Sequence, residues 1–471
     1  MLELYDYQDQ AIIDLRRAYS SGSRAPLLVL PTGGGKTVCF TYMAQQASGK
    51  GLSVLLLAHR KELVNQISTA LKLWNVPHGI ISPSHPATQH PVQVAMAQTL
   101  AKRVKLDRSG RFMFDLVIID EAHHATKDST WGAILEHNAG AKLLGVSATP
   151  CRLDGKGLGI TSDGFFDNIV IGPSAAELVE MGRLCAPVVY APDRMVDLSG
   201  VKKRGGDFVA GQLAKAVDKQ AITGDAVTHY RRYCDRQAAI AFTVTVEHAE
   251  HVVDEYKQEG YQAAVLTGAT PDKERAQMIR DLGNGGLHVL ASCNVVSEGT
   301  DIPAVAAAIL LRPTASYALA MQQIGRALRT MPGKDKAIIL DHAGNTLRHG
   351  LPTDEVGWSL NGMQRSGKVK LKTCTCKAII PWSAKKCPGC GKVFYSADPG
   401  TENSGSTRDL PITKSGELVE MSPEKLKEIR RQRYQEEKRA ASVDQLARIG
   451  VERGYKYPQS WAKKRFVELH R

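Results

Sequence analysis

The sequence predicts an α/β protein with two tandem domains built on parallel sheets. Short apolar runs of strand type alternate with longer stretches of helical period, which is typical of parallel strands joined by crossover helices. Five such runs lie in the first part of the chain, at 27–30, 53–58, 92–95, 114–120 and 141–146. After a glycine-rich stretch over 154–164 and a pause over 187–193, five more follow, at 238–243, 262–266, 287–291, 305–311 and 336–341. We therefore expect one domain over residues 1–175 and a second over 185–362.

The length and composition are those of a multidomain globular protein. A chain of 471 residues, 43% of them apolar, is too long for one ordinary core. No uninterrupted apolar run reaches ten residues, whereas a membrane helix needs about 18 to 20. The N-terminus lacks the basic-then-apolar order of a signal peptide. Membrane insertion and Sec-type export are therefore disfavoured, and we expect a cytoplasmic protein.

The last quarter of the chain carries nearly all of the excess positive charge. Residues 361–471 hold 24 Lys and Arg against 12 Asp and Glu, whereas residues 1–360 hold 37 against 36. A basic module on a neutral body is typical of a nucleic-acid-binding protein, because clustered Lys and Arg that bind phosphates release counterions and so gain affinity. The alternative is a charged, solvated tail that only aids solubility.

Three segments are predicted beyond the second domain. Residues 365–395 contain eight basic residues, no acidic residue and four clustered cysteines. Residues 396–423, with several Gly, Ser and Pro, are predicted to be a linker. Residues 424–471 are predicted to form a basic helical tail, with Trp461 and Phe466 available as its core. The five other cysteines are scattered. Scattered single cysteines indicate a reducing compartment, and the one cluster of four indicates a single metal site.

A glycine-rich turn follows the first predicted strand, and a helical pattern begins directly after it. The backbone amides of such a strand, turn and helix arrangement cradle phosphates, and glycines let the backbone close round them. Lys36 would reach the β and γ phosphates, and Thr37 would ligate Mg²⁺. The alternative is a flexible loop that merely turns the chain. The turn comprises Pro31, Thr32, Gly33, Gly34, Gly35, Lys36 and Thr37.

A second predicted strand ends in the adjacent carboxylates Asp120 and Glu121. Asp120 can hold Mg²⁺, and Glu121 can orient or deprotonate the attacking water. Two acidic residues after a strand often only cap the next helix. Beside a phosphate-binding loop, the hydrolytic interpretation is favoured.

These residues resemble the motifs of superfamily 2 helicases of the DEAH-signature type, in the right order over about residues 4–345. Motifs I, II and III are matched by Lys36, by Asp120-Glu121-Ala122-His123 and by Ser147-Ala148-Thr149. Motifs V and VI are matched by Gly299-Thr300-Asp301 and by the Q-x-x-G-R-x-x-R run from Gln322 to Arg329. The resemblance implies two RecA-like domains, with ATP bound between them and a nucleic-acid strand crossing both.

The resemblance also assigns residues to the nucleotide site. Gln8 would read the adenine edge through its paired donor and acceptor, and motif V would add Gly299 and Asp301. Arg326 and Arg329, one turn apart on a helix, would supply charge to the γ phosphate when the domains close. The alternative for these arginines is a surface pair.

Nucleic-acid contacts are expected at turns that follow predicted strands. Small residues, hydroxyls and helix N-terminal amides suit phosphate contact because they bind the backbone without reading bases. Ordinary helix capping is the alternative. The predicted contacts are Arg60, Gln98 and Thr99 in the first domain and Thr243, Thr267 and Gly268 in the second.

The cysteine cluster predicts a zinc ribbon. Four thiolates at Cys374, Cys376, Cys387 and Cys390 can close a tetrahedron around Zn²⁺. The second pair has a typical knuckle spacing, whereas only one residue separates the first pair. Free buried cysteines are the alternative. A rigid ribbon would hold nearby lysines against a phosphate backbone, among them Lys370, Lys385 and Lys386.

A zinc ribbon directly after the second motor domain resembles the RadD-type repair helicases of bacteria and phages. That resemblance implies action on DNA in repair or recombination, and the RadD group is associated with single-stranded DNA-binding protein. We therefore expect an ATP-dependent DNA helicase or translocase that uses ATP, Mg²⁺ and Zn²⁺. Three alternatives stay open: the motor subunit of a restriction-type complex, an RNA helicase and a largely structural DNA-binding protein.

Overall fold

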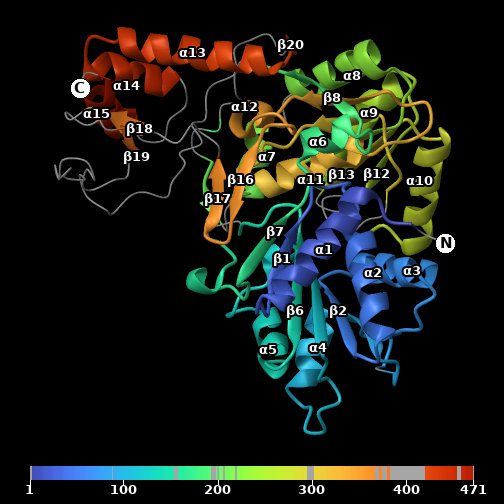
Figure 1. Ribbon diagram of the computed structural model, residues 1–471. Coiled ribbons are helices and arrows are strands. Elements are labelled where there is room, and N and C mark those ends of the chain that lie inside the picture. Colours follow the sequence, from blue (N-terminus) through green and yellow to red (C-terminus); the bar gives the residue numbers. More distant parts are fainter. Residues whose placement is uncertain are drawn as a thin grey trace.

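Two α/β domains lie one above the other in the computed structural model of the chain (Figure 1). The structure describes residues 3–469, apart from 87, 153–156, 193–197, 199–200, 205–206, 218–219, 294–301, 366–370, 374–378, 382–418 and 453–457. None of the helices in this described part is long and apolar enough to cross a membrane.

The first domain is a seven-stranded parallel sheet in the order β3-β4-β2-β5-β6-β1-β7. Its strands are β1 (Pro26–Val29), β2 (Val54–Ala58), β3 (Gly79–Ile81), β4 (Val92–Met96), β5 (Leu116–Asp120), β6 (Lys142–Ser147) and β7 (Asn168–Ile171). Its helices are α1 (Asp6–Ser20), α2 (Lys36–Ser48), α3 (Lys61–Leu73), α4 (Ala97–Val104) and α5 (Thr130–His137), with short 3₁₀ turns at Ala122–His124 and Ile160–Ser162.

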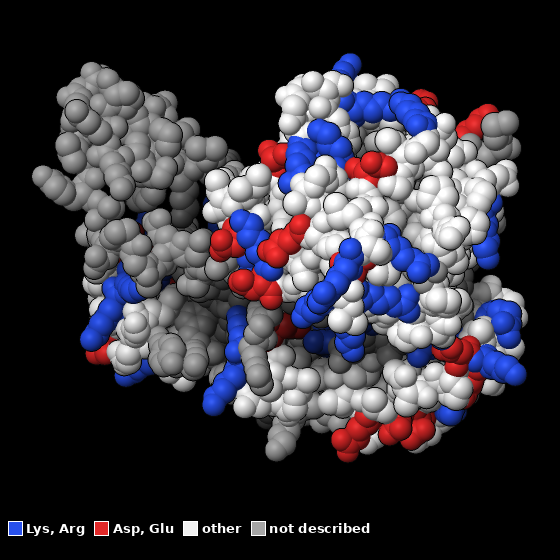
Figure 2. Space-filling model, turned by 90° about the horizontal axis from the view of Figure 1, so that it is seen from below, with Lys and Arg blue, Asp and Glu red and all other residues white. Residues whose placement is uncertain are grey.

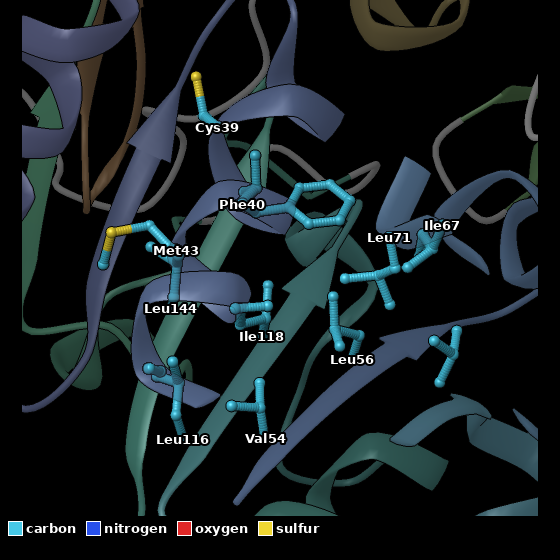
Figure 3. Close-up of a cluster of buried hydrophobic side chains, with 14 of the residues drawn as sticks. Cys39, Phe40, Met43, Val54, Leu56, Ile67, Leu71, Leu116, Ile118 and Leu144 are labelled. Atoms are coloured by element: carbon cyan, nitrogen blue, oxygen red, sulfur yellow. The ribbon is translucent and has the colours of Figure 1, made fainter. Parts of the chain in front are cut away.

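Helices cover both faces of this sheet, which is why its strands are apolar throughout. Successive residues of a strand face opposite sides, so Ile118 of β5 joins the core beneath α1, α2 and α3, and Ile119 joins the core beneath α4 and α5. Figure 3 shows the first of these layers, in which Phe40 and Leu71 pack over β2 and β5.

The second domain has a sheet in the order β12-β13-β11-β14-β15-β8-β20, parallel except at β20. Its strands are β8 (Ala186–Ala191), β11 (Ala239–Thr243), β12 (Ala263–Leu266), β13 (Val289–Cys293), β14 (Ala307–Leu310), β15 (Lys336–Asp341) and β20 (Val419–Glu420). Its helices are α6 (Ala175–Glu180), α7 (Ala210–Val217), α8 (Gln220–Cys234), α9 (Val246–Gln258), α10 (Asp272–Asn284), α11 (Tyr317–Leu328) and α12 (Asn345–His349), and β9 (Lys203–Arg204) pairs with β10 (Asp207–Phe208).

All ten predicted strands are strands of these two sheets, so the prediction of two parallel-sheet α/β domains is confirmed. The predicted pause over 187–193 is wrong, because most of it is β8, which pairs in parallel with β15. Pro187 is the second residue of this strand, a place near the strand start where proline is tolerated.

The predicted linker ends earlier than residue 423. Strand β20 pairs antiparallel with β8, and the backbone N–H of Met421 donates to Val189 O at 2.6 Å. Met421, Leu426 and Ile429 are buried in the core of the second domain. Residues 419–429 therefore belong to that domain, although they follow it by more than fifty residues in the sequence.

Helix α13 (Pro423–Arg439) leads from this strand to α14 (Val443–Glu452) and α15 (Pro458–Leu469). Four residues form a small core between them, Ala440, Leu446, Ala447 and Ala462, against which Trp461 and Phe466 pack. Strands β18 (Leu371–Thr373) and β19 (Ile379–Pro381) form an antiparallel hairpin.

A hairpin after the second domain reaches back to the first. Strands β16 (Val356–Ser359) and β17 (Gly362–Arg365) form this hairpin, and Trp358 of β16 and Leu360 of the turn between the strands pack against the core beneath α4 and α5. The N–H of Gly159 donates to Leu360 O at 2.9 Å, and a Cβ at Gly157 would lie 1.9 Å from that same oxygen. The glycine-rich stretch thus allows close approach of this hairpin.

Candidate functional site

The glycine-rich turn between β1 and α2 is shaped for close contacts. Gly35 is the N-cap of α2 with φ +80°, and Gly33 has φ +86°, so both adopt the left-handed conformation that glycine favours. A Cβ at Gly35 would lie 2.2 Å from Gln8 Nε2. The first amides of α2 have no partner within the helix, so the turn presents an N-terminus suited to an anion.

Gln8 lies buried against this turn. Its Oε1 accepts from the N–H of Tyr5 at 3.0 Å, and its Nε2 donates to Tyr7 Oη at 3.4 Å. The Tyr7 hydroxyl donates to Gly34 O at 3.2 Å. The ring of Tyr5 stays half-exposed, and the guanidinium of Arg183 stacks on it at 3.6 Å.

Charged groups from both domains converge on Lys36, the first residue of α2. Its Nζ donates to Leu30 O at 3.5 Å. Burial lowers the pKa of Lys36, the carboxylates of Glu121 and Asp120 oppose that shift, and Arg329 and Arg326 add to it. The other four residues predicted to be catalytic, two from each domain, therefore all influence the charge of Lys36.

The two carboxylates stand at the end of β5 in a strained turn. Asp120 is buried and accepts the N–H of Glu121 at 2.9 Å, and Glu121 itself has φ +49°. A left-handed non-glycine residue costs free energy and occurs preferentially at functional sites. His123 Nδ1 lies 3.4 Å from Glu121 Oε2 and 3.2 Å from Ser147 Oγ, so it links the carboxylate to the end of β6.

Helix α11 of the second domain packs directly on the turn. A Cβ at Gly325 would lie 2.5 Å from Thr32 Cγ2, so a larger residue would push the two domains apart. Arg326 is buried in the last turn of α11. In the turn itself, Gly34 is buried, and Thr32 and Thr37 are partly buried.

Arg329 does not continue the helix, contrary to the prediction of two arginines on one helix face. It is the C-cap of α11 with φ −62° and ψ 139°, and its backbone forms an antiparallel bridge with Leu184. Its Nη1 donates to Ile302 O at 3.2 Å. The strand-like pairing with Leu184 ends the helix one residue before Arg329.

Most predicted nucleic-acid contacts follow carboxyl ends of parallel strands. Arg60 is the N-cap of α3 after β2, Gln98 and Thr99 open α4 after β4, and Thr267 and Gly268 follow β12. Thr243 differs, because it is 1% exposed and its hydroxyl donates to Thr245 O and Ser292 O at 3.3 Å. Its side chain is therefore used within the protein.

Two ion pairs cross between the domains beside these turns. Lys61 Nζ lies 2.9 Å from Asp272 Oδ2, and Arg275 Nη1 lies 2.8 Å from Glu62 Oε1. They join the start of α3 to the start of α10, and sequence reasoning missed them because contacts over two hundred residues leave no local pattern.

Several predicted residues lie outside the described part of the chain. They are Gly299 and Asp301 of motif V, the lysines Lys370, Lys385 and Lys386, and the zinc-ligand candidates Cys374, Cys376, Cys387 and Cys390. Within the described residues, no three His, Cys, Asp or Glu side chains are grouped so that they could hold a metal ion.

Two family models match the chain. Residues 1–152 match the family described as type III restriction enzyme, res subunit, and residues 225–331 match the helicase conserved C-terminal domain.

Three curated relatives illustrate the similarity. A 51.5 kDa protein of Lactococcus phage (isolate 7-9) is 31% identical over 93% of this chain and 94% of its own length. IRC3 of Saccharomyces cerevisiae, named provisionally as an ATP-dependent helicase, is 30% identical over 72% of this chain, which spans about half (51%) of the yeast protein. The DNA 3'-5' translocase XPB2 of Sulfurisphaera tokodaii is 23% identical over 72% of this chain and 81% of its own length.

Two solved structures share the fold. A fragment provisionally identified as the HsdR subunit of a type I restriction enzyme from Vibrio vulnificus YJ016 has a TM-score of 0.56, with 22% identity, covering 74% of this chain and 65% of that one. The ATP-dependent type ISP restriction-modification enzyme LlaBIII, bound to DNA, has a TM-score of 0.50 with 19% identity, covering 72% of this chain and 27% of that one.

Proposed function

We propose a DNA-tracking motor function for this chain, which belongs to the superfamily 2 helicases. The chain is an ATP-hydrolysing helicase of that family. The observation that carries the proposal is the packing of the second domain on the phosphate-binding turn that contains Lys36, where Arg329 Cγ lies 3.7 Å from the position that a Cβ on Gly33 would take.

The first domain binds the nucleotide. Lys36 and the amides of the turn hold the phosphates, and Gln8 lies where it can meet the base. Thr37 and Asp120 offer the oxygen ligands that Mg²⁺ prefers, and a buried carboxylate at a strand end fits a cation. Bound there, Mg²⁺ would neutralise charge on the phosphates.

The second domain completes the catalytic site. Glu121 orients the attacking water and accepts its proton. Arg326 and Arg329 place positive charge where it develops on the γ phosphate, which they can do only while α11 is packed on the turn. Hydrolysis removes that attraction, so the domains separate and the motor takes one step.

Two comparisons favour DNA as the substrate, and the charge of the C-terminal part favours a polyanion. XPB2 is named as a DNA translocase and LlaBIII is bound to DNA. The +12 charge of residues 361–471 suits a polyanion. On the described surface, Lys and Arg are interspersed with Asp and Glu (Figure 2), so the body of the protein offers little single-sign attraction on that face. Arg60, Gln98, Thr99, Thr267 and Gly268 would contact phosphates along the strand.

The finer assignments are a RadD-type role in DNA repair or recombination, a cytoplasmic location and a single-stranded DNA-binding protein as partner. The order of motor domains and cysteine cluster in the sequence supports the RadD-type role and the partner, and the scattered single cysteines support a reducing compartment. A motor subunit of a restriction-type complex is the second candidate, favoured by the match of residues 1–152. It predicts translocation without strand separation.

The cysteine cluster is proposed to bind one Zn²⁺. Four cysteines within 17 residues supply the thiolate ligands of a structural Zn²⁺ site, and Cys387 and Cys390 have the C-x₂-C spacing of such sites. Elemental analysis of a Cys387→Ser, Cys390→Ser protein should show loss of about one zinc per chain. Retained stoichiometric zinc would rule out this site.

The main test is ATP turnover with different nucleic acids. Glu121→Gln should bind ATP normally and hydrolyse it about a hundredfold or more slowly, as expected for loss of a positioned base. Glu136→Gln, an exposed carboxylate on α5, is the matched control. Single-stranded, duplex and forked DNA should stimulate the wild type. If only RNA stimulated turnover, the proposed substrate would be RNA and not DNA. Wild-type turnover by Glu121→Gln would show that Glu121 is not the catalytic base.

A further inference from the structure

We propose that the interdomain segment Arg183–Cys185 positions Arg329 against the phosphate-binding turn, with Leu184 as the positioning residue. This inference rests on the role proposed for Arg329 and adds the element that sets its place. The segment connects α6 to β8 and passes between the two domains.

One side of the segment contacts the first domain. Leu184 is 2% exposed, and its Cδ2 lies 2.8 Å from where a Cβ on Gly33 would stand. Arg329 Cγ lies 3.7 Å from the same point. Gly33, Leu184 and Arg329 therefore meet at one place, with Leu184 filling the space beside the arginine stem.

The other side of the segment holds the backbone of Arg329. Leu184 forms the antiparallel bridge with Arg329, and the N–H of Cys185 donates to Leu328 O at 2.8 Å. Because Arg329 lies outside α11, the regular hydrogen bonds of that helix do not fix its direction. The bridge to Leu184 supplies the missing constraint.

Lys334 holds the same backbone from the second domain. Its Nζ donates to Arg329 O at 2.8 Å and also bonds to Ala327 O, and a cation there suits the C-terminus of a helix. Arg329 is thus tied to its own domain by Lys334 and to the phosphate-binding turn by Leu184. A shift of the turn is transmitted to the arginine through one side chain.

Arg183 extends this connection to the region beside Gln8. Its guanidinium stacks on Tyr5, and the N–H of Tyr5 donates to Gln8. Three successive residues therefore contact the entrance of the base site, the phosphate-binding turn and the arginine that completes hydrolysis. This arrangement couples nucleotide position to the placement of Arg329.

A double-mutant cycle on turnover tests the proposal. Leu184→Ala should lower turnover about tenfold or more while nucleotide affinity stays within about threefold, since the lost contact serves a group needed in the transition state. In the Arg329→Ala background, Leu184→Ala should have almost no further effect. Leu184→Met, which conserves volume, should restore most of the turnover.

Two controls separate positioning from damage to the core. Leu290→Ala removes a fully buried leucine from the same core cluster at β13 and should leave turnover near wild type. Leu184→Val is a smaller truncation for use if Leu184→Ala does not fold. Equal losses for Leu290→Ala and Leu184→Ala, or the same fold loss in both Arg329 backgrounds, would overturn the proposal. Wild-type turnover by Arg329→Ala alone would instead remove the proposed role of that arginine.

Discussion

Two strand-to-helix turns, one in each domain, have the same design and opposite uses. The turn from β1 to α2 and the turn from β15 to α12 both place a left-handed glycine at the N-cap of the helix, Gly35 with φ +80° and Gly344 with φ +68°. In the second domain, the carboxylate of Asp341 accepts the N–H groups of Ala343, Asn345 and Thr346 at 3.2, 3.1 and 2.5 Å. The protein's own anion occupies the helix N-terminus there.

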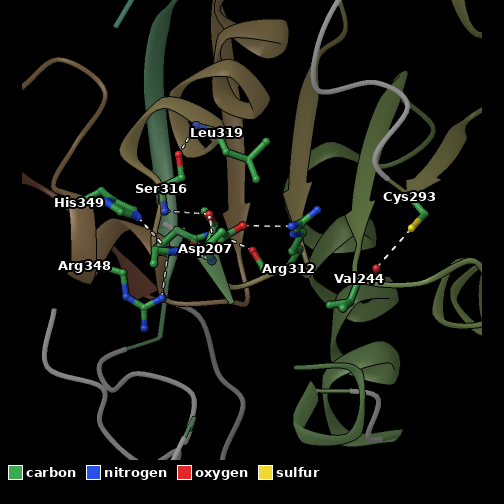
Figure 4. A network of polar contacts seen from close by, with 11 residues as sticks. Asp207, Val244, Cys293, Arg312, Ser316, Leu319, Arg348 and His349 are labelled. Atoms are coloured by element: carbon green, nitrogen blue, oxygen red, sulfur yellow. Dashed lines mark hydrogen bonds and ion pairs between the residues drawn. The ribbon is translucent and has the colours of Figure 1, made fainter. Parts of the chain in front are cut away.

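The surroundings of the second turn are a closed polar network. Arg312 pairs with Asp207 at 3.0 Å (Figure 4). Thr314 Oγ1 donates to the same carboxylate at 2.9 Å. Arg348 Nη1 donates to Thr314 O at 3.0 Å. The comparison teaches that a helix N-terminus can serve a ligand only where the chain leaves it unfilled. In the proposed function, the second domain supplies arginines to the site of the first.

The largest expected difference comes from matched glycine substitutions. Gly35→Ala forces a Cβ toward Gln8 and disturbs the amides proposed to hold phosphate. Each hydrogen bond lost to a charged phosphate should reduce the binding free energy by about 1.5–3 kcal/mol. Nucleotide affinity should fall on the order of a hundredfold. Gly344→Ala should leave affinity unchanged and cost about 1–2 kcal/mol in stability. Fluorescence titration with a labelled nucleotide checks both, and equal affinities for the two variants would break the comparison.

Asp341→Ala should destabilise the second domain without affecting nucleotide binding. The substitution leaves three buried N–H groups without an acceptor, and each unsatisfied group costs about 1–3 kcal/mol of folding stability. Asp341→Asn, which keeps an acceptor, is the control and should be milder. Hydrogen exchange of β15 and nucleotide titration measure the two effects. Weakened nucleotide binding by the folded Asp341→Ala protein would show that the two turns are not independent.

The second domain should lose stability as pH falls through the range where an ordinary histidine titrates. Burial, with His229 nearby, lowers the pKa of His342 to about 3. Between this value and the ordinary 6.5, the unfolded chain binds a proton that the folded chain does not, so stability rises with pH there, by up to about 1.4 kcal/mol per unit. His342→Gln should flatten the slope of β15 exchange protection against pH. An unchanged slope would contradict this assignment.

The smallest effect concerns the basic module. Removing everything after residue 361 would also remove Met421, Leu426 and Ile429 from the core of the second domain, so charge neutralisation is the cleaner test. Changing Lys370, Lys385 and Lys386 to Gln should reduce the slope of log affinity against log salt by about 2 on single strands, at ~0.7 per phosphate contact. The same change at Lys425, Lys427 and Lys438, exposed on α13, is the control. Equal slopes for both triples would favour a solubility role.

Sequence reasoning found what local pattern encodes. The apolar runs predicted ten strands that the two sheets contain, and the glycine turn and the strand-end carboxylates gave the predicted site, whose role stays a prediction. It missed β20, whose two residues have no periodicity, and placed Arg329 on the helix because pairing with Leu184 depends on a segment 145 residues away. The hydrogen bonds of Asp341 to the N-terminus of α12 could not be predicted either, since only the fold shows which amides a carboxylate contacts.

The central claim is that one ATP site is completed by the second domain, and Arg329→Ala tests it most directly. Nucleotide affinity and single-turnover hydrolysis should be measured on the same protein with saturating DNA. We expect affinity within about threefold of wild type and hydrolysis slower by about a thousandfold, the effect typical of a transition-state arginine. Hydrolysis at the wild-type rate, or a loss of affinity as large as the loss of rate, would contradict the account.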